Sequence, residues 1–282
     1  MKKVILLSAI MLMFGSVVNA ACEYKCVPAY NLNNKFRTLS AAATGFNSLV
    51  ERKVESIIKK EVLKISSAEK LDVSLQSYSP RDLKRGIFKS LKMNGTNLVM
   101  NDVHLSNLKL ETLCDFNYIE ETQDKVVFHE ELPMSFDMTF TQDDFNKTIL
   151  HDRYQLLVAD LNATIAKYVK GFGISSTKVA VKANKFYMII GFNLPMVRNE
   201  QKIVVQSDLN IKNGDIDLTN TRIVSGNLKL NLSKVDYMVK RLNPLNFSVN
   251  ILENQDAKVS VQDVEIINNK IVAKGIIIIP KS

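Results

Sequence analysis

The feature that most constrains the fold is a strict alternation of apolar and polar residues over residues 134–140. Every even-numbered position there is apolar and every odd-numbered position is polar, which is the pattern of a β-strand with one buried and one wet face. Shorter runs with a period of two recur at 71–75, 179–190, 203–211 and 228–232. The sequence therefore predicts a fold made mainly of antiparallel strands.

A helical period replaces the strand period in two long stretches. From about 41 to 65, apolar residues recur at steps of three and four, and charged residues fill much of the opposite side, which predicts a long amphipathic helix. A second helix is expected from about 143 to 168, with Thr141 or Asp143 as its cap. Strands and helices do not alternate regularly, so a doubly wound parallel sheet is not expected.

These patterns predict the α+β class, with many antiparallel strands and few long helices, and the simplest arrangement is a sheet that curls around the long amphipathic helix. Hairpin turns are indicated at Asn213 and Gly214 and at Asn268 and Asn269. The sheet would bury the apolar stripe of the helix. The pattern alone favours a packed interior over an open apolar groove, because such stripes usually belong to the core.

Residues 1–20 have the form of a cleavable secretory signal. Two lysines precede the almost wholly apolar stretch 4–18, and the small residues Val18 and Ala20 mark a cleavage site before Ala21. The apolar run is shorter than the roughly 20 residues that a membrane-spanning helix needs. We therefore expect an exported protein of the periplasm or cell envelope, soluble after cleavage between Ala20 and Ala21.

Two alternatives to a cleaved signal stay open at this point. One is an uncleaved N-terminal anchor. The other is a lipoprotein signal ending at Cys22, which is disfavoured because Asn19 stands where a Leu-like residue is expected. Beyond the signal, 21–40 is predicted to be a polar N-terminal extension and 41–282 a single elongated domain.

The charge of the chain favours an anionic partner. The formal net charge is +8, and the signal contributes two lysines and no acid, so the remainder carries 8 − 2 = +6. Such an excess suits a phospholipid surface or an acidic polymer. No basic stripe is interleaved with aromatic residues, so nucleic acid is not an expected partner.

Three cysteines, Cys22, Cys26 and Cys114, are disulfide candidates. Export permits disulfides, and the odd count leaves one thiol over. A Cys22–Cys26 bond would close a very small loop, whereas a Cys26–Cys114 bond would staple the N-terminus to the body, and the second pairing is slightly favoured. No His or Cys pair completes a metal site with the two N-terminal cysteines.

No catalytic constellation is found in the sequence. The histidines His104, His129 and His151 have no second His at metal-ligand spacing, so solvated or capping roles are expected. Asp143 and Asp144 stand at a helix start, where acids satisfy free amides. No nucleophile elbow, phosphate loop or dinucleotide fingerprint is present. We predict neither an enzyme nor a bound metal or cofactor.

Specific stretches between residues 46 and 279 nevertheless carry a family resemblance. They are the helix 54–58 with the strand 71–75, the segment 86–95, the strands 101–110, the acidic helix start 140–146, the Asn-Pro turn into a closing strand at 242–247, and the final hairpin 259–277. On these residues the chain resembles the LmeA-like phospholipid-binding family of bacterial cell-envelope proteins. It departs from that family in its richness in Asn and Lys and in the cysteine-bearing segment 21–40.

The resemblance implies an elongated, mostly antiparallel β-sheet or barrel-like fold curled around the long amphipathic helix, with an apolar cavity of the tubular lipid-binding type. It also implies non-catalytic binding or transfer of phospholipid or a similar acyl lipid. The alternative hypothesis is a structural or adhesive envelope module with a filled core and a protein or glycan partner, and a hydrolase with a dispersed site ranks last. The cavity residues expected are Phe46, Leu49, Val50, Ile57, Ile58, Met134, Phe136 and Met138. The residues expected to contact headgroups or a membrane peripherally are Lys59, Lys60, Lys84, Arg85, Lys89 and Lys92.

Overall fold

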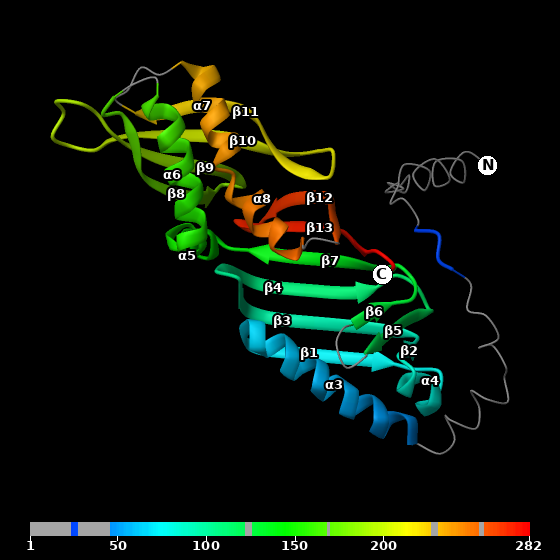
Figure 1. The fold of residues 1–282 in the computed structure, drawn as a ribbon. Coiled ribbons are helices and arrows are strands. Elements are labelled where there is room, and N and C mark those ends of the chain that lie inside the picture. The colour runs from blue at the N-terminus through cyan, green and yellow to red at the C-terminus, as the bar shows by residue number, and fades with distance from the viewer. Residues whose placement is uncertain (1–23, 28–45, 122–125, 168–169, 227–230, 254–256) are drawn as a thin grey trace, which may run out of the picture.

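The computed structural model of the protein describes residues 24–27, 46–121, 126–167, 170–226, 231–253 and 257–282. The predicted signal 1–20 and Cys22 lie outside the described residues. The molecule is elongated (Figure 1), and its helices and strands are labelled as in that figure.

Six antiparallel strands form the larger sheet. Their order is β1 (Ser66–Gln76), β3 (Ser90–Met100), β4 (Val103–Thr112), β7 (Leu132–Phe140), β13 (Lys270–Ile279) and β12 (Lys258–Ile267). The final hairpin of the chain thus pairs with a strand from its middle, β7. The alternation at 134–140 is borne out, because every apolar residue of that run in β7 is buried.

A second sheet of four antiparallel strands lies at the end of the molecule opposite α3 (Phe46–Ile65) (Figure 1). Its order is β11 (Asp215–Gly226), β10 (Gln201–Lys212), β9 (Lys185–Asn193) and β8 (Gly173–Lys182). A small third sheet contains β2 (Ile87–Phe88), β5 (Asn117–Glu121) and β6 (Val126–Phe128). The α+β class and the mostly antiparallel strands are confirmed. The described strands form open sheets and no closed barrel.

Two predicted hairpin turns are confirmed. Asn213 and Gly214 join β10 to β11, with φ of 56° and 87°. Asn268 and Asn269 join β12 to β13, with φ of 51° and 58°. Two consecutive residues with positive φ suit the right-handed twist of the flanking strands, and Asn and Gly reach this conformation most readily.

The helix expected at 143–168 is divided into α5 (Gln142–Leu150) and α6 (Asp152–Ala166), so the prediction of one helix was wrong. His151 between them has extended backbone, with ψ of 150°. Thr141 caps α5, and Asp144 bonds back to the Thr141 backbone in a capping box. Asp144 thus has the capping role expected of it, whereas Asp143 forms an ion pair of 2.6 Å with Lys147.

Three further helices complete the described chain: α4 (Pro80–Lys84), α7 (Leu232–Arg241) and α8 (Pro244–Val249), the last followed by the 3₁₀ turn η1 (Asn250–Leu252). The closing strand expected after the Asn-Pro turn is therefore a helix. Asn243 caps it through the Leu245 amide, and Pro244 occupies the first turn, where a missing N–H costs nothing. None of the described helices is long and apolar enough to cross a membrane.

α3 runs beside β1 at one end of the larger sheet (Figure 1). Val50, Val54 and Ile58 pack against a small cluster that includes Leu75 and Leu91. The main core lies elsewhere, among the four-stranded sheet, helices α5 to α8 and strands β4, β7, β12 and β13. The sheet does not close around α3, because β1 begins directly after Ile65 and holds the helix at the sheet edge.

The segment 24–27 is joined to the body by the Cys26–Cys114 disulfide, which has a Cα–Cα distance of 5.5 Å. This is the favoured pairing of the two predicted, and it is consistent with an oxidising compartment. Beside it the Tyr24 hydroxyl donates a hydrogen bond to Glu131. That bond, with partial burial, raises the pKa of Tyr24 to about 12.

Candidate functional site

An apolar row crosses five neighbouring strands of the larger sheet. Consecutive members are direct partners in the strand register: Val73, Met93, Leu110, Phe136 and Gly275. Directly paired residues of an antiparallel sheet point to the same face, so these side chains form one continuous strip.

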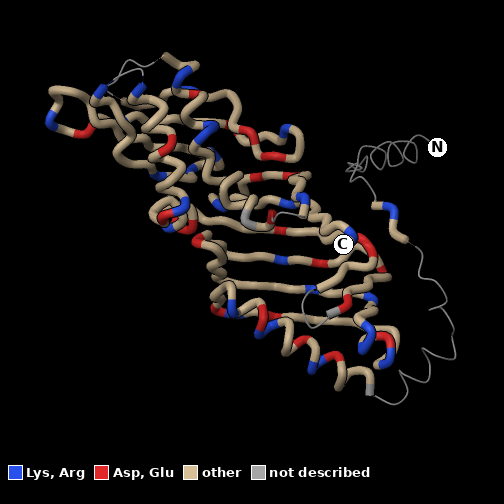
Figure 2. Tube along the Cα trace, in the orientation of Figure 1, with Lys and Arg blue, Asp and Glu red and all other residues tan. Residues whose placement is uncertain are grey.

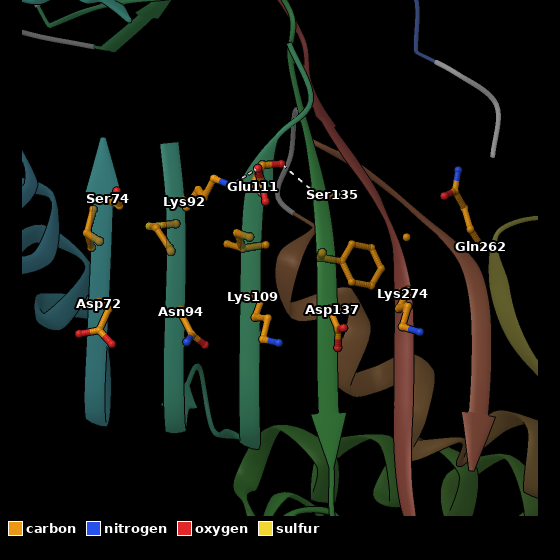
Figure 3. A pocket seen from close by; sticks show the side chains of 15 residues that line it. Asp72, Ser74, Lys92, Asn94, Lys109, Glu111, Ser135, Asp137, Gln262 and Lys274 are labelled. Atoms are coloured by element: carbon orange, nitrogen blue, oxygen red, sulfur yellow. Dashed lines mark hydrogen bonds and ion pairs between the residues drawn. The ribbon is translucent and has the colours of Figure 1, made fainter. Parts of the chain in front are cut away.

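A groove of about 520 Å³ follows this row across the sheet (Figure 3). Its volume falls within the range of roughly 300–1,000 Å³ that is usual for small-molecule sites. Besides the row, its lining includes Gln262 of β12 and the residues that precede or follow the row in each strand, whose side chains point to the opposite face of the sheet: Asp72, Ser74, Lys92, Asn94, Lys109, Glu111, Ser135, Asp137 and Lys274.

The apolar row is only partly covered. Val73, Met93 and Leu110 are partly exposed, although their neighbours along the same face, Leu71 and Leu91, are buried. These three side chains pack against the small cluster that α3 also contacts, so the strip is an apolar surface that is covered in part and reached by water in part.

Phe136 closes the row at one end by lying over Gly275. Phe136 is 2% exposed, and a Cβ built on Gly275 would stand 2.7 Å from its ring carbons and 2.1 Å from the Ser260 carbonyl oxygen. Only a residue without a side chain leaves room for the ring at this register position.

Most charges in the groove lining have carboxylate or ammonium partners. Lys92 Nζ lies 2.6 Å from Glu111 Oε1, and Lys274 Nζ lies 3.3 Å from Glu265 Oε1. Asp72 is paired with Lys70 at 2.7 Å. Because these pairs are exposed, they hold one another only weakly, and the groove presents polar groups as well as the apolar row.

The predicted cavity residues of α3 do not lie in this groove. Leu49 and Ile57 are 61% and 49% exposed, on the side of the helix away from the sheet. Val50 and Ile58 pack on the small cluster below α3. The Phe46 side chain lies outside the described part of the structure. The helix uses one narrow stripe for packing, because the sheet borders it on one side only.

The three cavity residues expected on β7 are all buried. Met134 and Met138 lie in the core, at 5% and 0% exposure, and Phe136 also lines the groove. Of the predicted headgroup residues, Lys59, Lys60, Lys84, Arg85 and Lys89 are exposed. Lys92 is exposed too, but it lines the groove and is paired with Glu111.

Sequence reasoning did not assign Val73, Met93, Leu110 and Gly275 to a site. The alternating pattern already placed the three apolar residues on strand faces. The signal that would have joined them is the register between strands that are distant in sequence, as for Phe136 and Gly275.

The histidines of the described chain are in contact with other polar side chains. His104 Nε2 and His151 Nε2 lie 3.1 Å apart, and His129 bonds Glu120 at 2.7 Å. Within the described ranges no group of three or more His, Cys, Asp or Glu side chains is arranged to hold a metal ion.

Comparison of the chain with protein-family models, curated proteins and solved structures found no match. The LmeA-like resemblance therefore stays a prediction from the sequence, and the proposals below rest on the groove and the surface of the protein.

Proposed function

We propose that this protein binds an acyl lipid, without chemical change, in the groove across the six-stranded sheet. The observation that carries the proposal is the strip of partly exposed apolar side chains, Val73, Met93 and Leu110, along a groove of about 520 Å³. An alkyl chain laid over this strip would leave water at about 0.8 kcal/mol per buried CH₂.

The size of this gain supports a chain and not a small polar ligand. Ten buried methylenes would contribute roughly 8 kcal/mol, against an association cost of about 4–15 kcal/mol. Ten methylenes offset only the lower part of that cost, so useful affinity in an open groove requires the long chains of a phospholipid or similar lipid. Met93 suits such a ligand, because its unbranched thioether adapts to different chain positions.

The proposed compartment is the periplasm or cell envelope. The predicted signal at 1–20 and the Cys26–Cys114 disulfide both favour export. A lipid that crosses an aqueous envelope space needs its chains covered, and we propose that the groove supplies part of this cover. The resemblance to the LmeA-like family favours the same function.

A charge placed in the apolar row tests the proposal. Met93→Glu should weaken uptake of a fluorescent phospholipid by about tenfold or more, because a carboxylate must be desolvated against the alkyl chain. Thr96→Glu is the matched control. It lies on the same strand, outside the groove, opposite Lys70 in the register.

Uptake should be measured by titration of each variant, with circular dichroism as the check on folding. Equal uptake by Met93→Glu and the unchanged protein would overturn the groove as the lipid site. Equal loss in both variants would also count against it, because the effect would then not depend on the groove.

A further inference from the structure

We propose that the outward side of α3, together with α4, docks the protein on an anionic phospholipid bilayer. The proposal rests on the proposed lipid binding for its purpose, since a lipid groove needs access to a membrane. Its physical basis is a separate surface, made of Arg52, Lys53, Lys59 and Lys60 on α3 and Arg81, Lys84 and Arg85 at α4, which we call the basic surface.

Two acids of α3, Glu51 and Glu55, lie on the side of the helix that faces β1. Glu55 Oε1 accepts a hydrogen bond of 2.8 Å from the Leu75 amide, and Glu51 Oε1 accepts one of 2.7 Å from the Ser77 amide. Glu61 bonds Lys64 at 2.7 Å. The acids of the helix therefore already have partners within the protein, either backbone amides at the end of β1 or a neighbouring lysine.

Apart from Lys64, the bases of α3 form no such bonds within the described residues. Arg52, Lys53, Lys59 and Lys60 are exposed, and none forms an ion pair with a residue in the described part of the chain. Figure 2 shows Lys and Arg along α3 and around α4 at this end of the molecule.

α4 extends the same basic surface. It packs beside α3, and Asn47 of α3 bonds Ser77 just before it. The acid of α4, Asp82, is 2% exposed and bonds Ser79 at the helix cap. Arg81, Lys84 and Arg85 are exposed. Here again the carboxylate is turned into the fold and the cations face water.

Exposed apolar side chains identify the partner as a bilayer and not an acidic polymer. Leu49, Ile57 and Leu63 are 61%, 49% and 40% exposed. At about 100° per residue they fall within an arc of roughly 120° on α3, with Lys53 and Lys60 between them. An apolar strip interleaved with lysines is the pattern of a helix that lies in a membrane interface. An acidic polymer would be attracted by the lysines, but it would bury no apolar surface against Leu49, Ile57 and Leu63.

Vesicle sedimentation of the full chain tests this surface. The probe is a vesicle of phosphatidylcholine, with or without phosphatidylglycerol. We expect binding only when phosphatidylglycerol is present, and a loss of about tenfold or more in the double variant Lys53→Glu, Lys60→Glu. Leu49→Ser should lower binding about fivefold, because it removes apolar area from the interface.

Lys178→Glu with Lys182→Glu is the matched control. Both lysines are exposed on β8, at the opposite end of the molecule, and the double variant has the same net charge change. It should bind vesicles as the unchanged protein does. Equal loss in both double variants would overturn the proposal, because attraction would then follow net charge alone.

Two further outcomes are decisive. Unchanged vesicle binding of Leu49→Ser, with binding of a soluble acidic polysaccharide that depends on Lys53 and Lys60, would replace the bilayer by a polymer partner. Uptake of monomeric fluorescent phospholipid by the groove should be unaltered in the α3 variants. If the groove does not bind lipid, neither the unchanged protein nor any variant will take up the fluorescent phospholipid. If only the docking proposal is wrong, uptake will be normal and vesicle binding will not depend on the basic surface.

Discussion

At the scale of single residues, Gly275 is the position where the groove has least room for change. A Cβ there would meet the Ser260 carbonyl oxygen at 2.1 Å and the Phe136 ring at 2.7 Å. Gly275→Ala should therefore destabilise the protein by about 2 kcal/mol, the usual cost of forcing extra volume into a packed site. The shift of the urea unfolding midpoint measures this cost.

Gly95 provides the control for this prediction, since it lies on the same face of the same sheet. An added Cβ there meets only Leu98 at 3.4 Å and Leu71 at 3.8 Å. Gly95→Ala should be neutral or stabilise by a few tenths of a kcal/mol, roughly the gain from a less flexible unfolded chain. Equal effects of the two substitutions would show that Phe136 does not need the space above Gly275.

His104 and His151 form a residue pair that should respond to pH. Their Nε2 atoms lie 3.1 Å apart, so one ring accepts a hydrogen bond from the other, and His151 Nδ1 lies 3.4 Å from Asp102. Burial lowers the pKa of His104, and the positive charges of His151 and Lys147 lower it further, against smaller opposing effects of Asp144 and Asp143. The folded state therefore binds a proton at His104 more weakly than the unfolded state does.

The sign of the pH effect follows from this difference. The stability associated with neutral His104 is present above its ordinary pKa of about 6.5 and is lost as the pH falls below that value. Urea unfolding at pH values on either side should show a smaller pH dependence for His104→Gln than for the unchanged protein. The same dependence in both proteins would contradict the account of the pair.

At the scale of elements, the local patterns predicted strands and turns well. The alternation in β7 and the Asn-rich turns of the last two hairpins depend on neighbouring residues only. The break between α5 and α6 at His151 was missed, because the apolar period continues through it. The helix α8 was also missed, since Phe247 and Val249 are spaced two apart and suit a strand as well as a helical turn.

The position of α3 was harder to predict than its existence. Its period fixes which residues share a face but not which face of the sheet, or which edge, will receive it. At the end of β1, the Leu75 and Ser77 amides donate hydrogen bonds to Glu55 and Glu51, and these bonds tie the helix to the strand that follows it. Leu49 and Ile57 therefore face away from the sheet, and their exposure becomes informative about a partner.

At the scale of the whole molecule, strand order determines the site. The apolar row exists because the final hairpin pairs with β7, which brings Gly275 beside Phe136. A shift of one residue in any of these strands would turn its member of the row to the other face. This register depends on contacts between distant segments, so the sequence predicted apolar strand faces but not the groove that joins them.

The measurement that tests the central claim most directly is mass spectrometry of an organic extract of the protein, purified without detergent. The account predicts an acyl lipid, near one molecule per chain, that is depleted in Met93→Glu and retained in Thr96→Glu. A clean extract, together with no uptake of fluorescent phospholipid, would contradict it and would favour the structural or adhesive module with a filled core.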